Sequence, residues 1–127
     1  AGNAEATFQL GYSYLWGDGV EQDVDRALEY FQQAAELGYI KSFRLIGNIL
    51  MQKGAMKEAM LNYRKAVICG YSIKHVFDML RDGYKDGYIT KEEYAFTLRE
   101  NQKASNEMKS ESREKAMKKI KAMKKSK

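Results

Sequence analysis

The chain contains an internal repeat, and this repeat constrains the fold more than any other feature of the sequence. Residues 27–39 read ALEYFQQAAELGY, and residues 59–71 read AMLNYRKAVICGY. The positions that recur 32 residues later are Ala27/Ala59, Ala34/Ala66, Gly38/Gly70 and Tyr39/Tyr71. Repeats of this length are typical of solenoids, in which each unit buries its apolar face by stacking on a neighbour.

A second repeated segment lies upstream of the first. LGYSYL at residues 10–15 matches IGNILM at residues 46–51, which is an offset of 36 rather than 32. The unit is therefore helix, loop and helix, with an inner loop four residues shorter in the second copy. We expect Gly11 and Gly47 to let the two helices of each unit approach closely.

Helical periodicity, glycine stops and caps predict the elements. The expected helices cover residues 4–16, 24–37, 40–52, 56–69 and 73–85, and Asp23 is the expected N-cap of the second. A further helix starts from a capping box at Thr90 and Glu93. The chain has no proline, which favours uninterrupted helices. Large apolar residues become sparse beyond Arg99. We therefore expect the last helix to run past the solenoid body, into solvent or onto a partner.

The first unit carries a recognisable pattern. Residues 10–38 read L-G-x-x-Y-x-x-G-x-G-V-x-x-D-x-x-x-A-x-x-Y-x-x-x-A-A-x-x-G. This resembles the Sel-one-like repeat, a relative of the tetratricopeptide repeat with an extended G-x-G-V loop. The second unit keeps Ile46, Gly47, Ala59 and Tyr63 but lacks that loop, and the third unit departs from the consensus.

The resemblance implies an all-α right-handed superhelix that works as an adaptor or scaffold and has no catalytic residues. We expect the C-terminal end of an array, with about three helical hairpins and a long C-terminal helix. The expected divisions are the tail of an upstream repeat (1–3), a Sel-one-like repeat (4–38), a shortened repeat (39–71), a degenerate capping hairpin (72–109) and a basic C-terminal extension (110–127).

Composition and motifs exclude several other classes. The single Cys69 rules out a disulfide framework and favours an intracellular, cytoplasmic location, although a targeting sequence upstream of Ala1 stays open. No apolar run approaches the roughly 20 residues that span a bilayer. The lone His75 has no Cys or acidic partner at metal-ligand spacing. We therefore expect no catalytic site, metal site or cofactor.

The first helices of the units predict a binding surface. Equivalent positions on these helices share one face, which lines the concave side of such a solenoid. The members of this predicted ladder are Phe8, Tyr12 and Trp16, then Arg44, Asn48 and Gln52, then Asp78, Asp82 and Asp86. Aromatic rings beside polar donors suit an extended or helical peptide. In the alternative, Phe8 and Tyr12 pack against an upstream repeat and the aspartates form a solvated face.

Positive charge is concentrated at the C-terminus. The net charge of +5 divides into +7 for residues 103–127 and −2 for residues 1–102. Three interpretations of the lysine-rich end stay open: a disordered solubilising tail, contact with an anionic partner such as nucleic acid or an acidic protein, and a membrane surface. The contact residues would be Lys115, Lys118, Lys119, Lys121, Lys124 and Lys125. Met117, Ile120 and Met123 form an apolar seam that is too short for a typical membrane anchor.

Two functions from different classes follow. The first is a non-enzymatic protein-interaction module that binds a peptide or subunit on the concave face, as a monomer or in a larger assembly. The second is an electrostatic binder that presents the lysine-rich helix to nucleic acid or another anionic partner. Salt separates the two, because phosphate binding weakens steeply with ionic strength.

Overall fold

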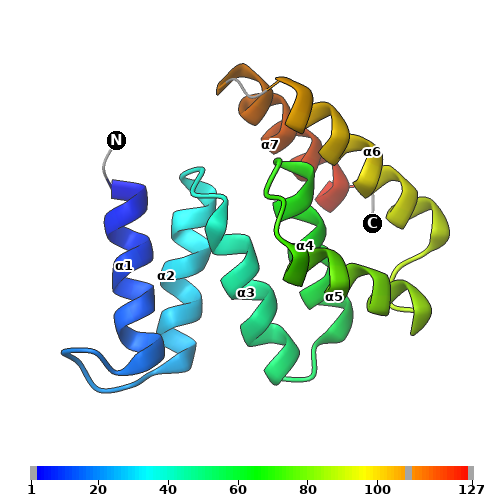
Figure 1. The fold of residues 1–127 in the computed structure, drawn as a ribbon. Coiled ribbons are helices and arrows are strands. Elements are labelled where there is room, and N and C mark those ends of the chain that lie inside the picture. Colours follow the sequence, from blue (N-terminus) through cyan, green and yellow to red (C-terminus); the bar gives the residue numbers. More distant parts are fainter. Residues whose placement is uncertain (1–2, 108–109, 126–127) are drawn as a thin grey trace.

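The computed structural model describes residues 3–107 and 110–125, and this part of the chain contains seven α-helices and no strand. The helices are α1 (Asn3–Trp16), α2 (Val24–Glu36), α3 (Lys41–Gln52), α4 (Met56–Ile68), α5 (Lys74–Lys85), α6 (Lys91–Glu107) and α7 (Ser110–Lys125). Helices α1 to α4 stand side by side as two hairpins (Figure 1). The fold is an all-α helical-repeat solenoid, as the sequence predicts.

Sequence signals at the helix ends explain where α2 and α4 start and stop. The Asp23 carboxylate accepts a hydrogen bond from a backbone N–H in the first turn of α2, which confirms the predicted N-cap. Gly38 and Gly70 follow the two helices with φ of +95° and +94°, a conformation that favours glycine. The N–H groups of Tyr39 and Tyr71 then donate to the carbonyls five residues earlier. Both repeats therefore end with the same turn.

Close helix approach within each hairpin depends on a glycine opposite an aromatic ring. A Cβ atom added to Gly11 of α1 would lie 2.9 Å from the Phe31 ring of α2. A Cβ atom added to Gly47 of α3 would lie 2.7 Å from the Tyr63 ring of α4. Both rings are almost completely buried. The predicted role of the two glycines is confirmed, since neither site has room for a side chain.

The third pair of helices is arranged differently from the first two. Helices α5 and α6 both pack on α4 and have little contact with each other. Gly83 of α5 follows Gly47 by 36 residues, but a Cβ atom there would collide with Met60 of α4. The first helix of the third pair therefore packs tightly on the preceding hairpin rather than on its own partner helix.

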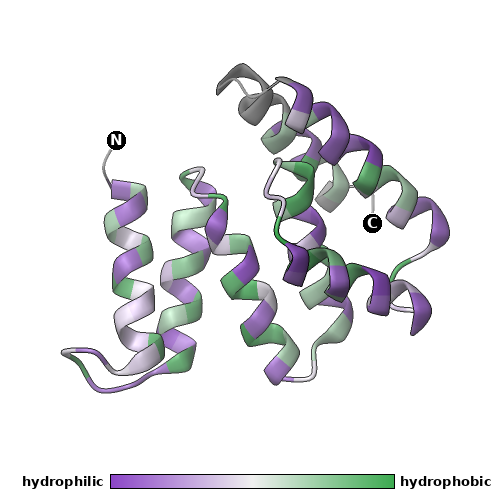
Figure 2. Cartoon of the chain, in the orientation of Figure 1, coloured by the Kyte–Doolittle hydropathy of each residue, from purple (hydrophilic) through white to green (hydrophobic). Residues whose placement is uncertain are grey.

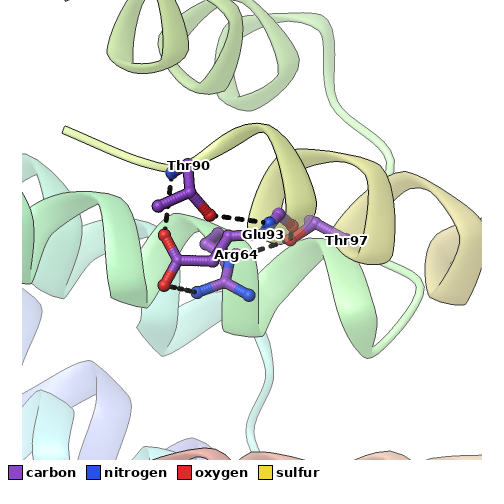
Figure 3. Close-up of polar contacts among 4 residues, drawn as sticks. All are labelled: Arg64, Thr90, Glu93 and Thr97. Carbon is purple, nitrogen blue, oxygen red and sulfur yellow. Dashed lines mark hydrogen bonds and ion pairs between the residues drawn. The ribbon is translucent and has the colours of Figure 1, made fainter. Parts of the chain in front are cut away.

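A partly buried polar cluster fixes α6 to α4 (Figure 3). The predicted capping box is confirmed: the Glu93 N–H donates to Thr90 Oγ1 at 3.0 Å, and the Thr90 N–H donates to Glu93 Oε1 at 2.9 Å. Arg64 of α4 donates from Nε to Thr97 Oγ1 at 2.8 Å, and its Nη1 lies 3.7 Å from Glu93 Oε2. Burial lowers the pKa of Arg64, and Glu93 opposes that shift.

The C-terminal segment does not run away from the body, which corrects the expectation of one helix extending into solvent. Helix α6 ends at Glu107, and α7 lies back alongside it (Figure 1). Figure 2 shows mostly hydrophilic residues along α6. Ala116 and Ile120 of α7 are nevertheless only 5% and 3% exposed. Burial of this apolar seam explains why residues 110–125 form a docked helix rather than the disordered tail considered above.

Overpacking tests the glycine contact. Replacing Gly47 by Leu forces Tyr63 away from α3 and should lower the free energy of unfolding by about 1–3 kcal/mol, the usual cost of overpacking. Urea denaturation of the purified protein measures this change. Gln52→Leu, on the exposed side of the same helix, is the control and should stay within about 0.5 kcal/mol of wild type. Equal stability of the Gly47 variant would contradict the contact.

Removal of one hydroxyl tests the polar cluster. Thr97→Val keeps the shape of the side chain but leaves the Arg64 Nε donor buried without an acceptor. The free energy of unfolding should fall by about 1–3 kcal/mol, which is the cost of an unsatisfied buried group. Thr7→Val removes an exposed hydroxyl that bonds only within α1 and should change stability much less. Thermal denaturation of the two variants measures the difference.

Candidate protein-binding surface

Tyr12 and Trp16 form an exposed aromatic pair on α1. Tyr12 is 44% exposed and Trp16 is 65% exposed, although both are large rings. Their ring centroids lie 6.3 Å apart in an edge-to-face arrangement. Phe8 lies one turn earlier, and its ring stacks with that of Tyr12 at 6.0 Å. The predicted aromatic stripe is therefore a continuous row that begins in the core and ends in solvent.

Phe8 belongs to the core and not to an open surface. Its side chain is only 3% exposed, which corrects its assignment as a partner-binding residue. The Phe8 ring lies 5.2 Å from that of Phe31 and 4.8 Å from that of Tyr39, between centroids. Tyr39 follows α2 and leads into α3, so that the turn between the two repeats covers Phe8. Residues of this chain are therefore sufficient to bury Phe8.

The three predicted polar members on α3 have different environments. Arg44 donates a hydrogen bond from Nε to the hydroxyl of Tyr71 at 3.1 Å. This bond uses one of the donors of the Arg44 guanidinium. Asn48 is half-buried, and its Oδ1 accepts a hydrogen bond from Tyr63 at 2.6 Å. Gln52 is exposed at the end of the helix. The structure therefore leaves Gln52 open and holds Asn48 in a fixed orientation.

His75 is a neighbour of this surface that sequence reasoning assigned only a structural role. Its Nε2 lies 3.4 Å from Asn48 Oδ1, and its ring lies edge-on to Tyr63 with centroids 6.4 Å apart. Burial raises the pKa of Tyr63 to about 12, so that its hydroxyl remains a donor to Asn48 at neutral pH. The sequence contained a signal for this position of His75. It lies in the first turn of α5, which is the counterpart in the third unit of the helix that carries Asn48.

Two of the three carboxylates in the third row of the predicted ladder, Asp78 and Asp82, form ion pairs, and the third, Asp86, is exposed. Asp78 lies 2.8 Å from Lys74 Nζ and 3.3 Å from Arg81 Nη1. Asp82 lies 3.5 Å from Arg81 Nη2. The hydrogen bond from Lys74 is the largest influence that lowers the pKa of Asp78. These exposed pairs agree with the alternative of a solvated, self-neutralising face.

The lysines predicted to contact an anionic partner lie on α7 and divide into three groups. Lys118 and Lys121 are exposed. Lys119 is paired with Glu100 of α6, so its charge is used within the chain. The structure does not describe the side chains of the other three, Lys115, Lys124 and Lys125.

Glu100 anchors α7 electrostatically. Its side chain is almost fully buried, and it pairs with Lys119 of α7 and, at 3.3 Å, with Lys103 of α6. Desolvation is the largest single influence on the Glu100 pKa and acts to raise it. The two lysines together outweigh this effect, so that the pKa lies below its ordinary value. Glu100 therefore remains ionised at neutral pH and holds both lysines.

No metal centre or membrane-crossing segment emerges from the described residues. Among them, no group of three or more His, Cys, Asp or Glu side chains is placed to hold a metal ion. Within the same residues, none of the helices is long and apolar enough to cross a membrane.

Comparison with known proteins identifies the first unit. Residues 4–39 match the Sel1 repeat, which agrees with the resemblance seen in the sequence. A relative is chitin synthase regulatory factor 4 of Schizosaccharomyces pombe, which is 35% identical over 66 residues. That match covers 51% of this chain and 10% of the relative. No solved structure matches the chain.

The matched repeat belongs to a class with a known general role. Sel1 repeats mediate protein–protein interaction and form a non-catalytic type of scaffold. The packing positions of the repeat, including Gly11 and Ala27, are buried here between α1 and α2. Tyr12 and Trp16 lie on the same helix but outside that contact, and both are exposed.

Phe8 and Trp16 differ in burial, and so their removal should change the stability of the protein by different amounts. Phe8→Ala should lower the free energy of unfolding by about 3–5 kcal/mol, the usual cost of removing a buried phenylalanine. Trp16→Ala should change it by no more than about 0.5 kcal/mol because the indole is mostly in solvent. Urea denaturation compares the two. A large loss of stability in the Trp16 variant would show that its ring belongs to the core.

Proposed function

We propose that this chain is a non-enzymatic protein-interaction module that binds a peptide segment of a partner protein across Tyr12, Trp16, Asn48 and Gln52. These residues occupy equivalent positions on α1 and α3, the first helices of the two regular hairpins. The observation that carries the proposal is the exposed aromatic pair Tyr12 and Trp16 on a helix whose other side is fixed by core packing.

The aromatic pair has the properties of an interface anchor. Exposed tyrosine and tryptophan supply large contact areas at low cost in side-chain entropy, and they are the residues most enriched among binding hot spots. Tyr12 is already oriented by its stack on the buried Phe8 ring. A partner therefore meets a ring whose position is set before binding.

The polar neighbours on α3 suit a peptide backbone. Asn48 Oδ1 is occupied by Tyr63, which fixes the amide plane and leaves the amide nitrogen as the donor for a partner carbonyl. Gln52 is exposed one turn further along and can both donate and accept. Arg44 contributes less, because it is already bonded to Tyr71.

A second candidate function is electrostatic binding through α7. It rests on the exposed lysines Lys118 and Lys121 and on the excess positive charge of residues 103–127. Residues 115–127 contain lysines but no arginine, and this favours diffuse attraction to phosphates over base reading. The pairing of Lys119 with Glu100 reduces the charge available for this role.

Affinity capture with matched variants tests the first proposal. Wild type, Tyr12→Ala, Trp16→Ala and Tyr84→Ala are used as baits in extracts of the native cell, and the bound proteins are quantified by mass spectrometry. Tyr84 is an exposed tyrosine on α5 and serves as the control. A partner that uses the aromatic pair should be lost with the first two variants and retained with the third. Its affinity for each α1 variant should fall by about 2 kcal/mol, or roughly 30-fold.

Salt and the lysines decide between the two functions. Binding through the aromatic pair should change little between low and physiological salt, whereas binding to phosphates should fall steeply. Replacing Lys118 and Lys121 by Gln should likewise leave partner affinity almost unchanged. If the lysine variants lose binding and the α1 variants keep it, the electrostatic function is correct instead.

A further inference from the structure

Arg44 occupies a repeat position that holds an apolar residue in the first unit. It follows Phe8 by 36 residues, and Tyr71 follows Tyr39 by 32, which are the offsets that relate the two units. In the first unit Tyr39 covers the buried Phe8 ring, with 4.8 Å between the ring centroids. In the second unit Tyr71 instead accepts a hydrogen bond from Arg44. Equivalent positions therefore hold a core ring in one unit and a guanidinium in the other.

The guanidinium of Arg44 has no carboxylate partner within the part of the chain that the structure describes. The side chain is half-buried, and its Nε donates to the Tyr71 hydroxyl, which is neutral. The buried Arg64 of α4, in contrast, lies 3.7 Å from the Glu93 carboxylate. Taking a charge out of water without a counter-charge costs free energy. Positions that break a packing rule in this way are typical of functional sites.

The polar groups that remain open around Arg44 are donors. Among the described residues nothing bonds to its two Nη groups, because the bond to Tyr71 uses Nε. Tyr71 accepts that bond, so its own O–H is left to donate. Asn48 lies one turn further along α3, and its Oδ1 is 2.6 Å from the Tyr63 hydroxyl and 3.4 Å from His75 Nε2. The Asn48 amide nitrogen is thus the group that remains, and a ligand at this place has to supply acceptors.

The charges around this place favour an anionic ligand. Helix α3 carries Lys41 and Arg44 and has no acidic residue. Glu5 is the acidic residue of α1, and it forms no ion pair with α3 in the described structure. Asp78 of α5 is neutralised by Lys74, whose Nζ lies 2.8 Å away. The first turns of α1, α3 and α5 therefore carry more positive than negative charge.

From these contacts we propose that Arg44 binds a carboxylate of the partner peptide, supplied by an Asp or Glu side chain. Its two Nη groups match the two oxygens of a carboxylate, and the Asn48 amide and the Tyr71 hydroxyl donate beside them. Arg44 adds little to the contacts with the peptide backbone, and its remaining donors instead select one side chain of the peptide. This inference rests on the proposed function, since the peptide that contacts Tyr12 and Trp16 also supplies the carboxylate.

Nuclear magnetic resonance of the arginine side chains tests the site without a partner protein. The probe is N-acetyl-L-glutamate methylamide, titrated into the full isotope-labelled chain while the arginine Nε–Hε signals are followed. The Arg44 signal should shift to saturation, and the neutral glutamine analogue should leave it unchanged. Arg99 on α6 is exposed and is the control for non-specific attraction. An Arg44 signal that shifts no more than that of Arg99 would overturn the proposal, as would stronger binding of inorganic phosphate than of the glutamate probe.

Selection from a random peptide library displayed on phage tests the class of partner. Peptides that bind the full chain and lose binding to Trp16→Ala should be enriched in Asp or Glu. Changing that acidic residue to Asn or Gln should weaken binding about tenfold, the value of a charge-assisted hydrogen bond. Arg44→Met should weaken the acidic peptide by the same factor and should not weaken its Asn or Gln version, because the two changes remove one interaction. Arg44→Lys keeps the charge without the planar fork and should restore binding only in part.

The outcomes separate this proposal from the proposed function. Peptides that need Trp16 but show no acidic preference would overturn the carboxylate site and leave the proposed function standing. If no selected peptide depends on Trp16, the proposed function is contradicted, and the resonance titration still decides whether Arg44 binds a carboxylate. The melting temperature of Arg44→Met should stay close to that of wild type, because the equivalent position in the first unit holds the core residue Phe8. A large fall would assign Arg44 a structural role instead.

Discussion

The contact between a glycine and a buried aromatic ring is the interaction on which the rest of this structure depends. Gly11 against Phe31 and Gly47 against Tyr63 set how closely the two helices of each hairpin approach. A solenoid has few contacts between distant units, so that the geometry inside each hairpin decides how the next one stacks. Phe31 also supports Phe8, and Phe8 in turn orients Tyr12. The exposed aromatic pair therefore depends on a packing contact that lies one helix away.

The fold also depends on helix α4, because several other helices pack on it. It is the partner of α3 in the second hairpin, and both α5 and α6 pack on it. Arg64 on this helix is buried, and it holds the capping box of α6 through Thr97 and Glu93. Leu61 on the same helix lines the clefts that Ile120 and Met123 of α7 also line. Helix α4 therefore connects the regular repeats with the C-terminal helices.

The sequence predicted the features that depend on residues close together in the chain, namely the helix limits and caps. The repeat period, the glycine stops and the Asp23 and Thr90 caps predicted the first five helices and the start of the sixth to within one or two residues. Helical spacing placed Phe8 correctly in one row with Tyr12 and Trp16, but spacing carries no information about depth. Phe8 is buried because Tyr39, at the turn between the repeats, covers it, and only the three-dimensional packing of two repeats shows this.

The position of α7 could not be predicted for a related reason. Its seam of Met117, Ile120 and Met123 was visible in the sequence, but a seam does not say which surface receives it. The receiving groove is assembled from α2, α3 and α4, and its residues are far from α7 in the chain.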